Sequence, residues 1–241
     1  MINFKNIKKA SILGLLFFLP VIFLLFLYPS THNYNTLDIV KENVLELSKH
    51  NQESSVITQF ESKLTVLAFL GKQPMSNSIA ALNLKELIYE NFKGFKGFQI
   101  VVIIPKGTQS QIEELEKELI TYEELEYWHF VFSSENEINN IYNSLLSKHN
   151  LDINLSNNEV FIIDKDLNQR GRIDDRTDNE LEINTEVYGL SSYNCIEVAD
   201  IKHKMSEDLR ILFTEYRQKR KGNFDSSSRR AKDLKKQDEK N

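Results

Sequence analysis

Short apolar runs alternate with longer amphipathic stretches from residue 64 onward, and this alternation predicts the fold. Leu64–Leu70 and Phe98–Ile104 are almost continuously apolar, which is typical of strands buried on both faces. Trp128–Phe132 and Glu159–Ile163 predict two further strands. Because helical stretches separate these strands, we expect an α/β fold with a central sheet that is at least partly parallel.

Four helices are predicted from apolar residues that recur at helical spacing. The first runs from Ser76 or Ser78 to Phe92, and the last from about Val198 to Arg217. The other two begin at capping-box patterns, Thr108–Gln111 and Ser134–Glu137. The expected inward-facing residues are, in chain order, Ile79, Leu82, Leu84, Leu87 and Ile88; Ile112, Leu115 and Leu119; Ile138, Ile141, Tyr142, Leu145 and Leu146; Ile201, Met205, Leu209, Leu212 and Phe213.

Two segments that flank the strands are also informative. Leu37–Leu47 is compatible with an amphipathic helix, or with an extended lead-in that ends in a short strand at Val44–Leu47. Asp164–Asn168 has the composition of a hairpin turn after the fourth predicted strand.

The N-terminus predicts a membrane anchor. Residues 1–10 carry three lysines, and Ser11–Tyr28 then holds no charged residue over a length that can cross a bilayer as a helix. A cleaved signal peptide is the competing interpretation, but no small-x-small cleavage site follows the apolar run. The lysines place residues 1–10 in the cytoplasm and the later chain outside it. We therefore expect a single-pass protein of the inner (cytoplasmic) membrane, with its domain in the periplasm.

Composition divides the remaining chain into a linker, a domain and a tail. Residues 29–36 form a polar linker, residues 37–217 the domain, and residues 218–241 a basic tail that we expect to be solvated and disordered. The tail could instead contact anionic lipid or an acidic partner. The whole chain has a formal net charge of −5, so the domain is acidic, and we expect no nucleic-acid partner.

Two strand-turn segments are similar to those of a known family: Lys63–Gly71 and Glu159–Asp175 (EVFIIDKDLNQRGRIDD). With the predicted anchor and the order of elements, they resemble a thioredoxin-like domain and, more narrowly, the Sco/SenC family of membrane-anchored copper-delivery proteins. The resemblance implies a central mixed sheet flanked by helices, copper bound by a Cys-x-x-x-Cys pair and a distant histidine, and a role in cytochrome oxidase assembly.

The residues that would hold the copper are missing. The family's cysteine positions fall at about Met75 and Ile79, and its histidine position at about Ser156. None of these side chains is a thiolate or an imidazole, so the sequence predicts a degenerate member with no metal site, no cofactor and no catalytic residue. The Met75 thioether could contact Cu(I), which leaves a weak copper carrier as an alternative.

The sole cysteine, Cys195, offers a second alternative because it precedes the last predicted helix. A thiol near a helix N-terminus can have a lowered pKa, which would allow a single-cysteine redox enzyme. The competing interpretation is an inert, partly buried side chain. With one cysteine, no intrachain disulfide is possible.

The histidines show no metal-ligand spacing. His129 lies within a predicted strand, and His203 and Met205 are two apart, which points them to different faces of the last helix. No zinc, phosphate-loop or nucleophile-elbow motif occurs. The five histidines are His32, His50, His129, His149 and His203.

The densest charge cluster is RGRIDDRTD, over residues 170–178. It could be a recognition loop, since exposed arginines make bidentate contacts, or a salt-bridge network paired with itself. The cluster contains Arg170, Arg172, Asp174, Asp175, Arg176 and Asp178. The sequence as a whole predicts a non-catalytic, membrane-anchored binding or assembly module of the bacterial envelope with a protein partner.

Overall fold

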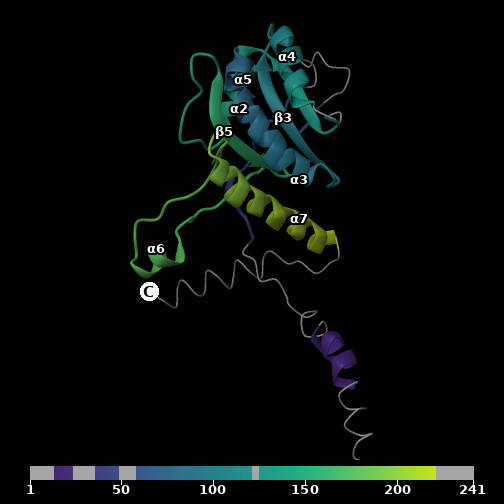
Figure 1. Ribbon diagram of the computed structural model, residues 1–241. Helices are drawn as coiled ribbons and strands as arrows, with labels where there is room; N and C mark the ends of the chain where they lie inside the picture. The colour runs from purple at the N-terminus through teal and green to yellow at the C-terminus, as the bar shows by residue number, and fades with distance from the viewer. Residues whose placement is uncertain (1–13, 24–35, 49–57, 121–124, 221–241) are drawn as a thin grey trace, which may run out of the picture. The chain divides into compact units, whose positions relative to one another are not determined.

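The protein is built around one mixed β-sheet, seen in a computed structural model that describes residues 14–23, 36–48, 58–120 and 125–220 (Figure 1). Within this part of the chain the strand order is β1-β6-β5-β2-β3-β4, and β7 pairs with β5. The strands are β1 (Asp38–Lys41), β2 (Leu64–Leu70), β3 (Phe98–Pro105), β4 (Trp128–Ser133), β5 (Ser156–Ile163), β6 (Gln169–Gly171) and β7 (Tyr193–Asn194).

Strand direction changes at the middle of the sheet. β2, β3 and β4 are parallel neighbours, whereas β5 lies antiparallel to β2 on its other side. β5 and β6 then form an antiparallel hairpin, and β1 pairs antiparallel with β6. A β-helix-β unit, an antiparallel hairpin and a closing helix together make a thioredoxin-like α/β fold. The predicted mixed sheet is confirmed.

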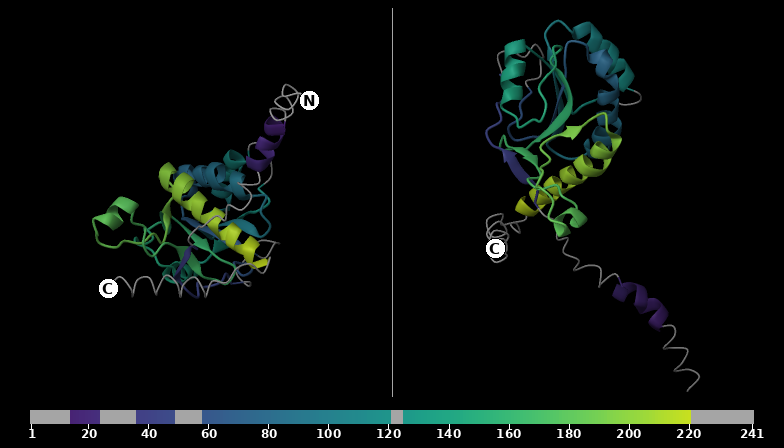
Figure 2. Two further views of the ribbon diagram at one scale, coloured as in Figure 1. Left: turned by 90° about the horizontal axis from the view of Figure 1, so that it is seen from below. Right: turned by 90° about the vertical axis from the view of Figure 1, so that its left-hand side faces the viewer.

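Helices fill the connections between the strands. The described ones are η1 (Pro74–Asn77), α2 (Ser78–Leu84), η2 (Lys85–Tyr89), α3 (Glu90–Phe92), α4 (Gln109–Leu119), α5 (Glu135–Asn143), α6 (Asp178–Glu182), η3 (Asp200–Met205) and α7 (Ser206–Arg220). The right-hand view of Figure 2 shows α5 on one side of the sheet and α2 with α7 on the other.

Every residue of β2 is buried because each face of the sheet has its own hydrophobic core. Leu64, Val66 and Ala68 point into the core beneath α2, α4 and α7, whereas Leu67 and Phe69 point into the core beneath α5. Alternate side chains of a strand lie on opposite faces, so a strand covered on both sides is mostly apolar. The one polar residue of β2, Thr65, accepts a hydrogen bond from the Gln99 side chain at 2.8 Å. Burial on both faces explains the nearly continuous apolar run in the sequence.

The first predicted helix is present but is not uniform. A 3-10 turn leads into α2, a π-helical stretch follows, and α3 completes the run at Phe92. The side chain of Ile79 is 61% exposed, so its expected place in the core is wrong; Ala80, Ala81 and Leu84 face the core instead. Leu82 and Leu87 are only partly buried.

The other predicted helices are confirmed with changes at their ends. α4 buries Ile112, Leu115 and Leu119 as expected. The prediction of a capping box at Thr108 is wrong, because the Thr108 hydroxyl donates to the Pro105 carbonyl at 2.8 Å and does not cap the helix. Ser134 does cap α5 by accepting from the Glu137 backbone N–H. The residues predicted to face inward on the third and last helices are buried, except for Leu146, which is 46% exposed, and Phe213, which is partly buried. Leu145 and Leu146 follow the end of α5 at Asn143.

The two flanking predictions have different outcomes. Residues 37–47 form no helix, and the strand there is β1 rather than the predicted Val44–Leu47. The hairpin turn is confirmed: the Asp164 carboxylate accepts from the backbone N–H groups of Asp166 and Asn168, both at 2.9 Å.

The chain divides into two units between residues 35 and 36. In the first unit a helix over residues 14–23 exposes its large apolar side chains. Among the described residues, no helix combines the length and the apolar character needed to cross a membrane. The predicted span of residues 11–28 extends past the described residues at both ends. Residues 1–10, nearly all of the 29–36 linker and residues 221–241 of the tail also lie outside them.

Candidate functional site

The turn that follows β2 is the place where the sequence resemblance puts a reactive site. Gly71 begins this turn with a φ of 72°, and a Cβ atom there would lie 2.4 Å from the Asn154 carbonyl oxygen. The Lys72 backbone N–H donates to the same oxygen at 2.7 Å. The turn is therefore pressed directly against residues 152–156, which lead into β5.

Asp152 organises this facing loop. Its carboxylate accepts from the backbone N–H groups of Ser156 at 2.7 Å and Asn154 at 2.9 Å. Desolvation by the loop by itself raises the pKa of the exposed Asp152, but these hydrogen bonds favour the charged form and lower the pKa below its usual value. The loop is held by a carboxylate that faces inward to its own backbone rather than outward to a ligand.

The three positions aligned with copper ligands carry no ligand set. Met75 lies in η1 and packs against the core. Ile79, the second residue of α2, is exposed, and Ser156, the first residue of β5, pairs with Leu70. Leu70, the last residue of β2, also accepts a hydrogen bond from the Asn77 side chain at 2.9 Å, so β5 and η1 both contact the end of β2. A lone thioether among the three positions supplies one weak, soft donor, so the residues present do not fit a copper ion.

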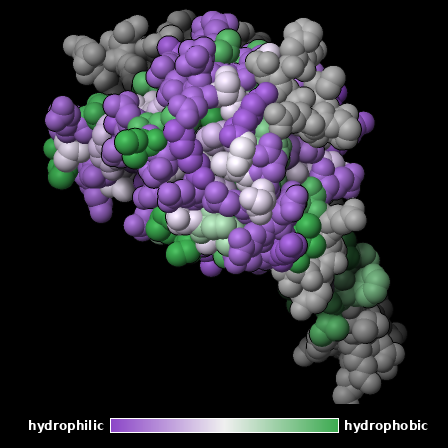
Figure 3. Space-filling view, turned by 90° about the horizontal axis from the view of Figure 1, so that it is seen from above, coloured by the Kyte–Doolittle hydropathy of each residue, from purple (hydrophilic) through white to green (hydrophobic). Residues whose placement is uncertain are grey.

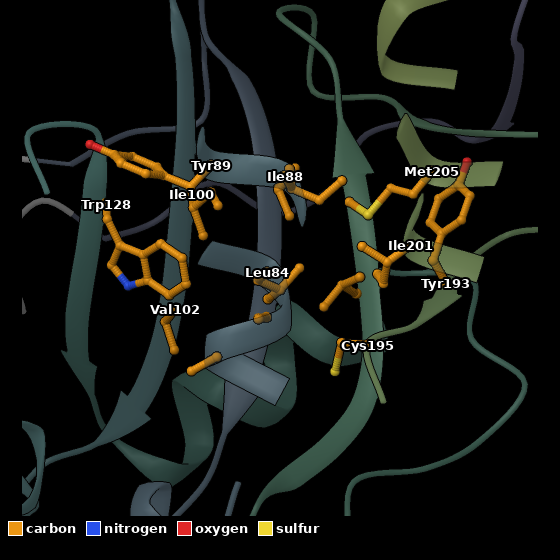
Figure 4. Close-up of a cluster of buried hydrophobic side chains, with 14 of the residues drawn as sticks. Leu84, Ile88, Tyr89, Ile100, Val102, Trp128, Tyr193, Cys195, Ile201 and Met205 are labelled. Carbon is orange, nitrogen blue, oxygen red and sulfur yellow. The ribbon is translucent and has the colours of Figure 1, made fainter. Parts of the chain in front are cut away.

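Cys195 is a structural residue of the core. Its side chain is 1% exposed, and Figure 4 shows it among apolar side chains that include Leu84. The thiol donates to the Asn158 carbonyl at 2.8 Å. Burial raises the pKa of the thiol from 9.0 to about 12, so the lowered pKa considered for a redox enzyme is wrong. The pairing of β7 with β5 places this residue beneath the surface.

The charge cluster at residues 170–178 is a salt-bridge network. Arg170 is 5% exposed and binds Asp164 at 3.1 Å and Glu215 at 2.9 Å. Arg176 pairs with Asp174 at 2.7 Å. The arginines of this cluster are therefore paired within the protein, which favours the salt-bridge network of the two interpretations.

Arg172, the residue that follows β6, lies at the centre of the network and binds α7. Its guanidinium binds the fully buried carboxylate of Asp208 at 2.7 Å and Asp175 at 3.0 Å. The Tyr193 hydroxyl donates to the same Asp208 carboxylate at 2.6 Å. Burial raises the pKa of Asp208 above its usual value, although the hydrogen bonds from Arg172 and Tyr193 oppose this shift.

The histidines lie apart from one another. His129 is half-buried in β4, where burial and the charge of Lys63 lower its pKa. His203 is exposed and Met205 is buried, as their spacing predicts. His32 and His50 lie outside the described residues. No group of three or more metal-binding side chains (His, Cys, Asp or Glu) occurs within the described ranges.

Sequence reasoning missed a polar cluster around Glu159. The buried Glu159 carboxylate accepts from the Ser147 hydroxyl and lies 3.0 Å from the Nδ1 atom of His149. The Tyr142 hydroxyl donates to the His149 carbonyl at 2.6 Å. These contacts fasten the loop after α5 to β5. No motif marks them, because the residues are brought together only by the fold.

Comparisons with known proteins show no family for this chain. No family model matches it, and no curated protein matches it. Among solved structures it is similar to a SCO1/SenC family lipoprotein from Bacillus anthracis, with 12% identity, 72% of this chain and 97% of that chain covered, and a TM-score of 0.43. A putative thiol:disulfide interchange protein DsbE from Chlorobium tepidum gives 12% identity, 73% and 97% coverage, and a TM-score of 0.41.

An uncharacterized conserved protein from Geobacillus kaustophilus gives 18% identity, 61% and 74% coverage, and a TM-score of 0.32. At such identities and TM-scores a likeness assigns no activity. The description of this chain as thioredoxin-like rests on its own strand order and pairing.

Proposed function

We propose that this protein is a non-catalytic thioredoxin-like binding module of the bacterial envelope. Residues 11–28 anchor it to the inner membrane, and the domain lies on the periplasmic side. Its task is to hold a protein partner during the assembly of a membrane complex. The sequence resemblance to the Sco/SenC family suggests cytochrome oxidase as that complex.

One observation carries the proposal: the site of thioredoxin-type chemistry is kept as a scaffold without a nucleophile. Gly71 makes a close turn against Asn154, and Met75 and Ile79 lie at about the positions where the resemblance puts the family's cysteines. The single thiol in the chain, Cys195, is buried and hydrogen-bonded, and burial raises its pKa. A thiolate is needed for exchange chemistry, and this environment opposes its formation.

An anaerobic Cu(I) titration tests the metal half of this proposal. The full-length chain, purified in detergent, is titrated against a competing Cu(I) chelator beside the Met75→Leu and Cys195→Ser variants. We expect all three proteins to leave the copper on the chelator. Competitive binding that is lost in either variant would contradict the proposal and identify a copper carrier.

The membrane location is tested separately. An alkaline phosphatase fusion after Arg220 reports whether the domain is exported, and carbonate extraction reports whether the chain stays in the membrane. We expect an active fusion and a chain that resists extraction. An inactive fusion, or release by carbonate, would overturn the anchored arrangement while leaving the copper result unaffected.

A further inference from the structure

The segment between β6 and β7 projects from the rest of the domain and carries α6 near its tip (Figure 1). We call residues 173–188 the acidic arm. Its two legs are paired at the root: Arg172 and Leu190 form an antiparallel bridge, and the Asp175 backbone N–H donates to the Tyr188 carbonyl at 2.9 Å. The arm is therefore a defined structural feature rather than an unstructured connection.

Hydrogen bonds within the arm hold its shape. Thr177 and Glu180 form a reciprocal capping box at the start of α6, and the Tyr188 hydroxyl donates to the Glu180 carboxylate at 2.9 Å. The Arg176 guanidinium donates to the Thr185 carbonyl at 2.8 Å. Each contact is made between arm residues, so the arm keeps this shape without packing its tip on the core.

This arrangement leaves large apolar side chains in solvent. No residue of α6 is buried. Elsewhere the face seen from above is mostly hydrophilic, with hydrophobic groups in small separate places (Figure 3). Exposed apolar residues gathered on one projecting element are typical of a docking surface. The exposed apolar residues of the arm are Ile173 (59%), Leu181 (48%), Ile183 (73%), Val187 (55%) and Tyr188 (42%).

The charges of the arm indicate what it can bind. Residues 173–188 contain six acidic residues and one arginine. Asp174 and Asp175 are ion-paired, whereas Asp178, Glu182 and Glu186 have no ion-pair partner within the described part of the chain. Acidic groups between apolar ones favour a partner with basic and apolar side chains, and they oppose contact with an anionic lipid surface.

The root of the arm lies where the domain begins. The Ile173 backbone N–H donates to the Asp38 carboxylate at 3.2 Å. Asp38 follows Tyr28, the end of the predicted membrane span, by ten positions, and a chain of that length reaches at most about 35 Å. A tether of this length to the proposed anchor favours a partner at the same membrane.

We propose that the acidic arm is the docking surface for a basic segment with apolar side chains, carried by another protein at that membrane. This inference rests on the proposed function and specifies its surface and partner class. The arm supplies apolar contact through Ile183 and its neighbours, and Asp178, Glu182 and Glu186 fix the register of the basic side chains.

The test uses full-length protein in nanodiscs with an environment-sensitive dye on Asn179→Cys in α6. An amphipathic Leu/Lys peptide is the probe, and its Leu/Glu counterpart is the charge control. We expect the basic peptide alone to change the dye signal. Ile183→Ser, or Glu182→Lys with Glu186→Lys, should weaken this binding about tenfold.

Matched variants outside the arm make the result specific. Ile153→Ser removes a side chain that is 90% exposed, and Glu113→Lys with Glu114→Lys reverses two exposed charges on α4. We expect both variants to bind like the wild type. Equal weakening by these variants, or no binding, would overturn the docking surface.

Two further outcomes would replace the proposed partner. If a stop codon after Arg220 raises the peptide affinity about tenfold, the basic tail of this chain is the occupant. If the arm variants dissociate a dimer, a second copy is the occupant. Neither outcome changes the Cu(I) result, so failure of the arm inference is distinguishable from failure of the proposed function.

Discussion

The Asp208 carboxylate holds α7 to the sheet, and its removal should be costly. Asp208 is 0% exposed and receives hydrogen bonds from Arg172 at 2.7 Å and Tyr193 at 2.6 Å. The variant Asp208→Ala leaves a guanidinium and a fully buried hydroxyl without this acceptor. We expect the free energy of unfolding to fall by about 3 kcal/mol.

This magnitude follows from the two partners. Removing one member of a buried ion pair costs about 3–5 kcal/mol. Because the Arg172 side chain is 28% exposed and keeps Asp175, we assign it about 2 kcal/mol. The Tyr193 hydroxyl, left unsatisfied in the core, adds about 1 kcal/mol.

The neighbouring Glu207 provides a matched control. It lies 3.5 Å from the same guanidinium, but its side chain is 66% exposed. Glu207→Ala should therefore cost less than about 0.5 kcal/mol. Adding Tyr193→Phe should cost about 1 kcal/mol in the wild type and almost nothing in Asp208→Ala, since the hydroxyl has already lost its acceptor.

Urea unfolding of the full-length chain measures these differences. Trp128, the single tryptophan, is 5% exposed and reports unfolding by its fluorescence. If Asp208→Ala costs no more than Glu207→Ala, or if the effect of Tyr193→Phe is the same in both backgrounds, the network does not hold α7 as we describe.

Three further predictions use the same unfolding assay. Gly71→Ala should lower the free energy of unfolding by about 3 kcal/mol, because its Cβ would meet the Asn154 carbonyl oxygen at 2.4 Å. Gly107→Ala, where φ is also positive but no atom lies within contact distance of the added Cβ, should lower it by about 1 kcal/mol. Equal losses in the two variants would contradict the steric argument. Asp152→Ala should cost about 0.5 kcal/mol at neutral pH. The lowered pKa of Asp152 means that its contribution is present above its unfolded value near 3.8 and is lost as the pH falls through the folded value; a pH-independent difference would refute this. Ile183→Ser should change stability by less than about 0.5 kcal/mol, and a larger loss would show that this side chain packs within the protein.

The sheet could be predicted from the sequence because burial on both faces leaves a direct pattern. β2 and β3 are buried along their whole length and appear as nearly continuous apolar runs, in which Thr65 and Gln99 hydrogen-bond to each other. The hairpin turn was also predictable, because Asp164 accepts from nearby backbone groups of its own turn. Local chemistry fixes both features.

Features that depend on distant contacts could not be predicted in the same way. Thr108 precedes α4 at the N-cap position, yet its hydroxyl donates to the Pro105 carbonyl, which competes with the capping geometry. The burial of Cys195 depends on β7 pairing with β5. Arg172 and Asp208 are 36 residues apart, so the sequence shows a charge cluster but not its partners on α7.

The lack of a thiol at Met75 and Ile79, where the resemblance puts the family's cysteines, was predictable from residue type alone. The state of Cys195 was not, because a position ahead of a helix favours a lowered pKa, whereas burial has the opposite and larger effect. The acidic arm left no periodic pattern, since α6 is short and buries no residue.

Thiol reactivity of the native full-length chain tests the central claim most directly. Alkylation of Cys195 by iodoacetamide at pH 8 is compared with the same reaction in urea. A pKa of about 12 instead of 9.0 lowers the thiolate fraction about 1000-fold. We therefore predict labelling at least that much slower in the folded protein, and no insulin-disulfide reduction above that of Cys195→Ser. Rapid native labelling, with turnover that disappears in Cys195→Ser, would show that the chain is a thiol enzyme.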